Sequence, residues 1–212
     1  MQRSGLFAAC MICLAIYHSP ASAIEPAMKK TSSSITDFGA VEDGATINTR
    51  AIQAAIDHVA SAAGGTVIIP AGTFLSGAIF LKPRVALQLD KDAVLKASTN
   101  IADYPLTNTR IEGHFQDWVP ALVNAEKIDN LRITGNGTLD GSGKPFWEEF
   151  WRRYKADPKT KNLDVLRPRL LFVSQCNDAQ ISGISLKDSA FWNLHVYNCD
   201  GVAINGLERL FA

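Results

Sequence analysis

The C-terminal part of the sequence repeats itself. The stretch from Leu171 to Ile184 aligns with the stretch from Leu194 to Leu207, 23 positions later. In this alignment Cys176 matches Cys199, and the apolar and glycine positions on either side match as well. A third copy begins at Val123, 48 positions before the first of these two. Short β-branched or leucine-rich runs, separated by Gly, Asn and Asp, fill every copy.

A period of about two dozen residues with several short strands is typical of a right-handed parallel β-helix, in which each coil stacks on the last. Antiparallel sandwiches have no reason to repeat side-chain identity, and leucine-rich repeats would carry a helix in every unit. The sequence therefore predicts an all-β fold, a right-handed parallel β-helix. The predicted strands are 66–69, 78–81, 85–89, 131–133, 170–173, short runs at Ile181 and Ile184, and 194–197.

A helix is predicted before the first strands, over Asn48 to Ala63. Its apolar residues fall on one face, and Gly64-Gly65 ends it. We expect this helix to cap the N-terminal end of the solenoid, with Asn48 or Thr49 capping its own first turn. Two segments interrupt the strand pattern: 100–116, predicted as a loop, and 145–164, predicted as a short helix or excursion.

The first 23 residues are predicted to be an export signal. Arg3 precedes an apolar run, Gly5 to Tyr17, and Ala21-Ser22-Ala23 is a small-x-small cleavage site. The apolar run is shorter than the ~20 residues that span a bilayer. We therefore divide the chain into a signal peptide (1–23), a flexible lead-in (24–34) and an incomplete β-helix domain (35–212), and expect a secreted or periplasmic protein.

The charge balance and the cysteine content argue against several classes of function. The chain has 21 basic and 21 acidic residues, which argues against a general nucleic-acid binder or a membrane-surface protein. Once the signal is removed, only Cys176 and Cys199 remain, without metal-ligand spacing. No metal site and no cofactor are predicted. The two cysteines are expected to stack on adjacent coils as buried, reduced side chains.

The block TRAIQAAIDHVASAAGGTVIIPAGTF resembles the capping helix and first strand of pectin-degrading β-helix enzymes. Two further blocks resemble glycoside hydrolase family 28, the polygalacturonases, which share the pectin lyase-like solenoid: LRITGNGTLDGSG and RPRLLFVSQCNDAQISGISLKDSAFWNLHVYNCDGVAINGL. The resemblance covers Ile35 to Leu207. It implies a secreted pectin-degrading hydrolase that cleaves α-1,4-linked galacturonan with inversion. Its partner would be a pectic polysaccharide, galacturonan or rhamnogalacturonan, and its oligomeric state stays open.

The catalytic motifs of that family do not occur in this sequence. The family carries Asn-Thr-Asp, Asp-Asp, Gly-His-Gly and Arg-Ile-Lys motifs; here 48–50 and 108–110 read Asn-Thr-Arg, and 113–115 reads Gly-His-Phe. No residue is therefore assigned a catalytic role, and the chain is expected to be the N-terminal part of such an enzyme, inactive alone. Two alternatives remain open: a polysaccharide lyase on the same fold, or a non-enzymatic carbohydrate-binding β-helix.

Two groups of residues are candidates for contact with sugar. Trp192 and His195 lie beside the last strand, where an aromatic face suits sugar stacking and an imidazole suits a carboxylate or hydroxyl; turn packing and an outward scaffold position are the alternative interpretations. The second group could line an anionic groove or simply form a solvated helix: Phe146, Trp147, Trp151, Arg152 and Arg153. Asp140 and Asp188, at strand ends, are predicted to form turns rather than act as acids.

Overall fold

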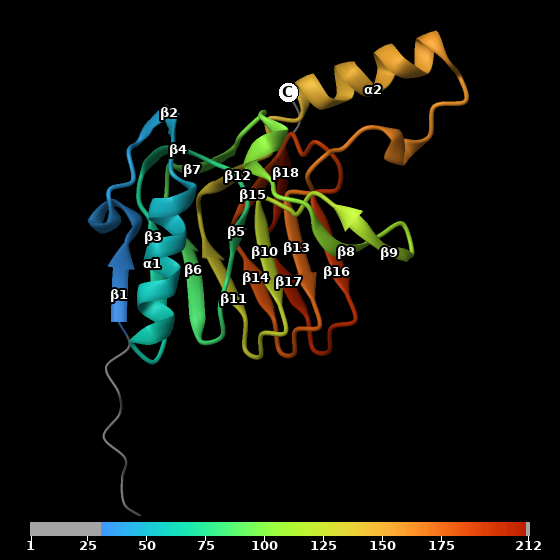
Figure 1. Ribbon diagram of the computed structural model, residues 1–212. Helices are drawn as coiled ribbons and strands as arrows, with labels where there is room; N and C mark the ends of the chain where they lie inside the picture. The colour runs from blue at the N-terminus through green and yellow to red at the C-terminus, as the bar shows by residue number, and fades with distance from the viewer. Residues whose placement is uncertain (1–30, 211–212) are drawn as a thin grey trace, which may run out of the picture.

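Three parallel sheets wind into a solenoid (Figure 1). The computed structural model describes residues 31–210, with side chains up to residue 208, so the predicted signal peptide lies outside the described residues. Two sheets have six strands each and one has four, and neighbouring strands within them are parallel. The predicted parallel β-helix is thus confirmed. In the described residues no helix is both long and apolar enough to cross a bilayer.

Each complete coil passes through the three sheets in the same order: sheet C, then sheet A, then sheet B. Sheet A holds β1 (Thr31–Ser34), β3 (Gly65–Ile69), β6 (Val85–Leu89), β11 (Arg132–Gly135), β14 (Gln180–Ser182) and β17 (Ala203–Asn205). Sheet B holds β2 (Asp43–Ile47), β4 (Gly72–Ser76), β7 (Ala93–Ala97), β12 (Thr138–Asp140), β15 (Ser185–Lys187) and β18 (Glu208–Leu210). Sheet C holds β5 (Ile79–Phe80), β10 (Val123–Glu126), β13 (Leu171–Ser174) and β16 (Leu194–Tyr197).

The sequence repeat matches the register of the strands. Val123 pairs with Leu171, and Leu171 pairs with Leu194, so equivalent positions of successive copies are neighbours in sheet C. Ile133 and Ile181 are aligned in the same way in sheet A. These side chains point inward and form a continuous buried core, because a parallel strand places alternate residues on one face.

The two cysteines continue this ladder; Cys176 is buried as predicted, whereas Cys199 is only partly buried. Cys176 and Cys199 are both free thiols, and the Cys176 amide donates to Cys199 Sγ at 3.3 Å. Cys176 is fully buried, and this burial raises the pKa of its thiol. They serve as small apolar side chains of the interior.

Helix α1 (Thr49–Ser61) covers the N-terminal coils, as predicted. Its apolar face is completely buried, and the buried residues are Ile52, Ala55, Ile56 and Val59. The predicted side-chain cap is wrong. The Asn48 side chain instead bonds the amide and carbonyl of Val41, and Thr49 Oγ1 accepts from the Gly77 amide at 2.7 Å. Both side chains therefore fasten the start of the helix to neighbouring turns.

Two predictions need correction. Residues 100–116 are not a loop: they include a 3-10 turn, η2 (Ile101–Asp103), β8 (Thr107–Ile111) and the start of β9 (His114–Trp118), which pairs antiparallel with β8. Glu112 and Gly113 both have positive φ, which suits a two-residue hairpin turn. The end of the predicted flexible lead-in, Thr31–Ser34, is strand β1, because its backbone pairs with β3. A further 3-10 turn, η1 (Ile35–Phe38), follows it.

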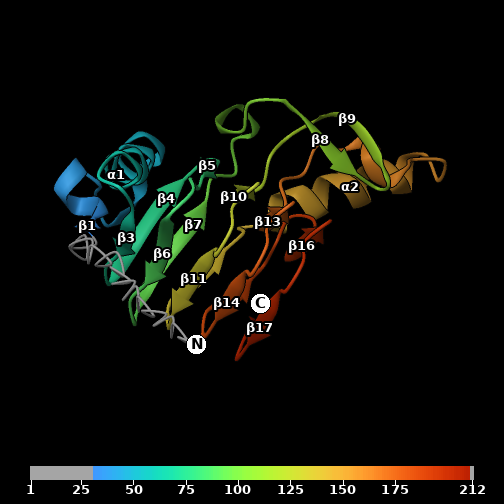
Figure 2. The same ribbon diagram turned by 90° about the horizontal axis from the view of Figure 1, so that it is seen from below.

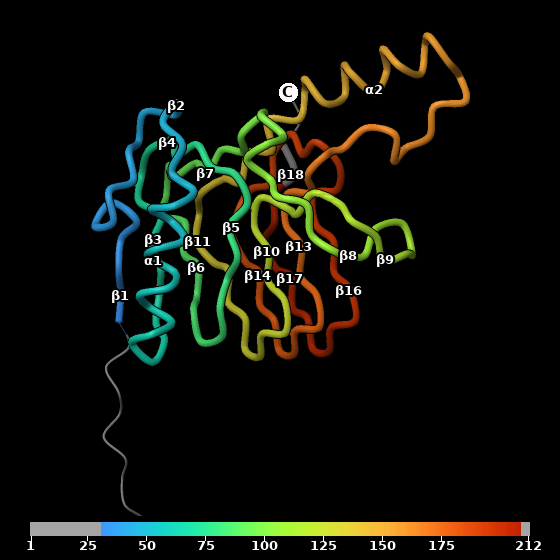
Figure 3. Tube along the Cα trace, in the orientation of Figure 1, coloured from blue at the N-terminus to red at the C-terminus, as the bar shows by residue number. Residues whose placement is uncertain are grey.

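Two excursions leave the solenoid at the same corner. The first, with the β8–β9 hairpin, joins β7 to β10; the second joins β12 to β13 and contains α2 (Lys144–Ala156) and η3 (Asn162–Asp164). Both connect a strand of sheet B to the next strand of sheet C, so they emerge from successive coils (Figures 2 and 3). The Asn162 side chain bonds Glu112 of the hairpin turn. The helix predicted within 145–164 is confirmed.

Candidate functional site

The outward face of sheet C lies beside both excursions. Strand register aligns one outward residue from each of its strands, in the order Phe80, Asn124, Phe172 and His195. Asn124 is buried and bonds Ile79 O and the backbone of Ala121, so its role is structural. The candidate ligand-binding side chains lie at the other end of this row, around β13 and β16.

Arg169 organises this end of the sheet. It lies just before β13 and is only 1% exposed. Its Nη1 donates to Arg110 O at 3.0 Å and to His195 Nδ1 at 2.9 Å, and its Nη2 donates to Thr109 Oγ1 at 3.1 Å. The guanidinium carbon also lies 4.0 Å from the centre of the Phe172 ring. One buried side chain therefore joins the hairpin, β13 and β16.

The contact with Arg169 determines the protonation state and the tautomer of His195. Burial is the main cause that lowers the pKa of His195 to about 4, and the charges of Arg169 and Arg110 lower it further. Burial lowers the pKa of Arg169 to about 10, with an opposing effect from Glu126, so Arg169 stays charged at neutral pH. Because an arginine can only donate, Nδ1 of His195 must accept. The imidazole is therefore neutral, with its proton on Nε2.

Trp192 lies against His195. The two rings meet edge to face at 4.7 Å, and Trp192 stacks on Phe191 at 4.7 Å. The Trp192 carbonyl accepts from Leu170 N and from Ser189 Oγ, both at 2.9 Å, which fixes the turn that carries the ring. The structure brings the two predicted sugar-binding residues together. Their contact with substrate stays a prediction.

Two further arginines surround this pair. The Arg110 guanidinium lies 4.5 Å from the centre of the Tyr197 ring, and Arg167 lies between the rings of Phe150 and Phe191, at 4.8 and 4.6 Å. Burial lowers the pKa of Arg167, opposed by the charge of Glu112. Such stacking favours arginine over lysine, because the guanidinium is planar and weakly hydrated. Arg110 is partly exposed beside these rings, whereas Arg167, like Arg169, is buried.

Sequence reasoning missed these three arginines. Arg167 and Arg169 belong to the Arg-Pro-Arg sequence that begins the family-28-like segment 167–207, but nothing in this tripeptide indicates that the arginines are buried. The partners of Arg169 on the hairpin are Arg110 and Thr109, 59 and 60 positions away. The sequence did hold a signal: β-branched Thr107, Thr109 and Ile111 alternate with polar Asn108 and Arg110, which is typical of a strand.

The aromatic-basic segment on α2 divides into two parts. Arg152 and Arg153 both bind Glu149, and these bonds hold the pKa of the Glu149 carboxyl at about 2. They are therefore engaged within the helix. Trp147 donates its indole N–H to Ser189 O at 3.0 Å, whereas Trp151 is 55% exposed. The remaining candidate, Phe146, is buried.

Asp140 ends strand β12 and Asp188 follows strand β15, at the strand ends where turns were predicted. Asp140 accepts from the Ser142 amide at 2.9 Å, and its other oxygen lies 3.2 Å from Lys187 Nζ. Asp188 has a left-handed backbone with φ of 44°, and its carboxylate lies 3.9 Å from the same ammonium. Both carboxylates are thus neighbours of Lys187 at the end of sheet B.

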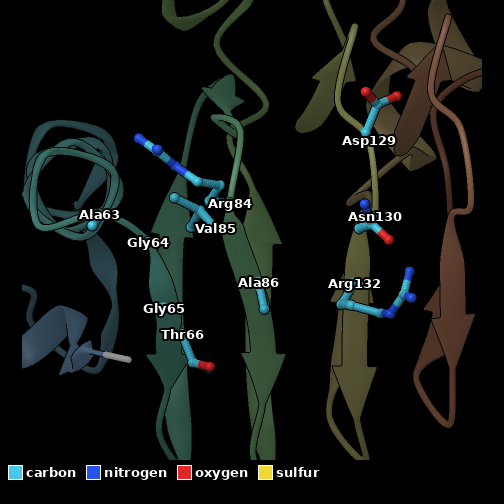
Figure 4. Close-up of a pocket in the computed structure, with 10 residues that line it drawn as sticks. All are labelled: Ala63, Gly64, Gly65, Thr66, Arg84, Val85, Ala86, Asp129, Asn130 and Arg132. Carbon is cyan, nitrogen blue, oxygen red and sulfur yellow. The ribbon is translucent and has the colours of Figure 1, made fainter. Parts of the chain in front are cut away.

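A separate cavity of about 290 Å³ lies on the outer face of sheet A (Figure 4). It is lined by residues of β3, β6 and β11 and by residues just before these strands. Its polar side chains include Arg132, which pairs with Asp178 at 2.9 Å. This cavity is on a different sheet from Trp192 and His195.

The sequence matches the family model described as glycosyl hydrolases family 28 over residues 60–208. The chain belongs to glycoside hydrolase family 28. It is 33% identical over 178 residues to an exopolygalacturonase of Zea mays, covering 80% of this chain and 38% of that protein. An exo-poly-alpha-D-galacturonosidase of Dickeya chrysanthemi is 40% identical over 134 residues, covering 59% of this chain and 20% of that protein.

Solved structures agree with this assignment. An exopolygalacturonase of Thermotoga maritima superposes with a TM-score of 0.74 at 26% identity, covering 88% of this chain and 48% of that one. The described chain thus has the right-handed β-helix of the polygalacturonases. It spans less than half the length of each of these three relatives.

Proposed function

We propose that this chain is part of a secreted or periplasmic hydrolase of polygalacturonase type, acting on α-1,4-linked galacturonan. The observation that carries the proposal is the cluster of Arg110, Arg169 and neutral His195 on the outer face of sheet C. Family membership and the names of the relatives support the same substrate class.

The cluster suits a uronate. A galacturonate unit carries one carboxylate, which fixed guanidinium groups and N–H donors bind well. His195 offers Nε2–H as a donor, because Arg169 occupies Nδ1. The Trp192 ring beside it suits the apolar face of a sugar. Arg169 itself is buried, so it acts as a positioning residue, whereas His195, Arg110 and Trp192 would touch the substrate.

Hydrolysis with inversion needs two carboxyl groups, one to protonate the leaving oxygen and one to activate water. In this family those groups belong to Asn-Thr-Asp and Asp-Asp motifs, and the sequence holds neither. The proposal therefore assigns the described residues to scaffold and binding, and proton transfer to carboxylates outside this sequence.

A protein made of residues 24–212 alone is expected to hydrolyse no measurable polygalacturonate. Each positioned acid or base contributes roughly 10²–10⁴-fold to such a reaction, and both would be missing. A reducing-sugar assay on the purified protein measures this, with an active commercial polygalacturonase as the control. Turnover above the blank would show that a carboxyl pair in this chain acts as acid and base.

Binding provides the direct test of the cluster. Trigalacturonate is expected to bind the chain at least about tenfold more tightly than its fully methyl-esterified form, because each charged hydrogen bond contributes roughly 1.5–3 kcal/mol. Isothermal titration calorimetry measures both ligands under one condition. Equal affinities, or no binding of the acid form, would rule out a uronate site on this face.

The reaction class, hydrolysis or β-elimination, is tested on the natural protein, produced from its own gene rather than from a segment that encodes residues 24–212 alone. New reducing ends without ultraviolet absorbance would support hydrolysis. Unsaturated products that absorb in the ultraviolet would instead show β-elimination, and the hydrolase proposal would then be wrong.

A further inference from the structure

Helix α2 presents an aromatic surface that the core does not use. Of its residues only Phe146 is buried. Trp147, Trp151 and Lys155 follow one another at four-residue spacing and so share one face of the helix. With Glu148 and Arg152 they line an open hollow of about 520 Å³. We call the three residues on this face the α2 platform.

The rings of the platform are held in place. Trp147 Nε1 donates to Ser189 O at 3.0 Å. Trp151 meets the rings of Phe150 and Tyr154 edge to face, at 5.2 and 5.7 Å, and Phe150 lies under the Arg167 guanidinium. A half-exposed tryptophan braced in this way loses little further freedom when a ligand stacks on it.

The platform and the candidate site share one turn. Ser189 accepts from Trp147 through its carbonyl, and its hydroxyl donates to the Trp192 carbonyl at 2.9 Å. The same hydroxyl accepts from the Phe191 amide. The turn 189–192 therefore carries Trp192 and also binds Trp147, so it links the candidate site to the start of α2.

The charge on the helix favours an anionic ligand. Helix α2 carries four basic residues, Lys144, Arg152, Arg153 and Lys155, against Glu148 and Glu149. Two of the arginines neutralise Glu149, and Lys155 lies at the hollow itself. A surface of two indole rings and an ammonium fits a sugar chain that presents apolar ring faces and carboxylates in turn.

We propose that the α2 platform is a second saccharide subsite, which binds an acidic polysaccharide chain extending beyond the Trp192–His195 site. The choice of a uronate polymer rests on the proposed function; the subsite itself rests on the platform's geometry. A trisaccharide held at Trp192 and His195 does not need the platform, whereas a longer oligomer gains contacts there.

The test compares trigalacturonate with a galacturonate oligomer of about ten units, titrated against the same purified protein of residues 24–212. Trp151→Ala and Lys155→Ala are each expected to weaken binding of the oligomer by about five- to tenfold, the range expected for one aromatic or cation contact. Binding of trigalacturonate stays unchanged. Trp151→Phe, which keeps a ring, retains most of the affinity. The control is Leu106→Ala, which removes a 60% exposed apolar side chain outside the hollow.

The outcomes separate the subsite from the function. Trisaccharide binding with no effect of either variant on the oligomer would overturn the subsite and leave the proposed function standing. Oligomer binding that depends on Trp151, without any trisaccharide binding, would support the subsite and refute the uronate site at His195. A neutral glucan of equal length that binds as tightly as the oligomer would overturn the assignment to an acidic chain.

Discussion

Replacing Gly135 with alanine is expected to destabilise the solenoid strongly. Gly135 ends β11 with φ of 127°, and a Cβ there would lie 1.9 Å from the carbonyl oxygen of Leu89 on the preceding coil. The next coil repeats the arrangement, since a Cβ on Gly183 would lie 2.3 Å from the carbonyl oxygen of Gly135. The neighbour in each case is backbone, which moves only if the coils separate. We expect a loss of more than about 4 kcal/mol in the free energy of unfolding.

A matched control separates the clash from backbone strain. Gly39 also has positive φ, 87°, but a Cβ there meets nothing within 4 Å. Gly39→Ala is therefore expected to cost about 1–2 kcal/mol, the penalty of a left-handed alanine alone. Urea denaturation followed by circular dichroism measures both variants. If Gly135→Ala were as stable as Gly39→Ala, close contact between coils could not be the reason for glycine at this position.

The same glycines show why the fold could be predicted from the sequence. Gly135, Gly183 and Gly206 recur at equivalent positions of three copies, and the cysteines at 176 and 199 recur in two of them. In a solenoid each inward or crowded position meets its equivalent on the next coil, so one spacing constrains many side chains at once. The repeat therefore predicted both the sheet register and the buried ladder.

The excursions could not be predicted in this way, because they do not repeat. Residues 107–118 form a hairpin although their sequence is largely polar; in the first strand only the alternation of β-branched Thr107, Thr109 and Ile111 distinguishes the sequence from that of a loop. The partners of Arg169 come from this hairpin and from the strand after its own. A local sequence pattern carries no information about contacts between distant segments. The sequence therefore indicated Trp192 and His195 as candidates but not Arg169, which joins the hairpin to β16.

Replacing Arg169 with methionine is expected to raise the pKa of His195 from about 4 toward its usual range, because one of the two charges that lower it is lost. The shift is partial, since burial is the larger cause and Arg110 remains. With Nδ1 no longer held, the imidazole also loses its fixed orientation, so binding of trigalacturonate falls by at least about tenfold. Proton NMR titration of the imidazole and calorimetry measure the two effects.

The pH dependence of the free energy of unfolding gives an independent measure of the His195 pKa. In the native chain the pKa of His195 lies below its unfolded value of about 6.5, so the unfolded state binds more protons in between. The contribution of His195 to the stability of the chain is therefore fully present above about pH 6.5 and is lost as the pH falls from there to about 4. Arg169→Met makes this part of the decline shallower, whereas Arg169→Lys keeps the charge and the steep decline but cannot donate in the same fork geometry. If both variants leave the His195 titration unchanged while uronate binding is lost, Arg169 acts on the ligand directly rather than by positioning the imidazole.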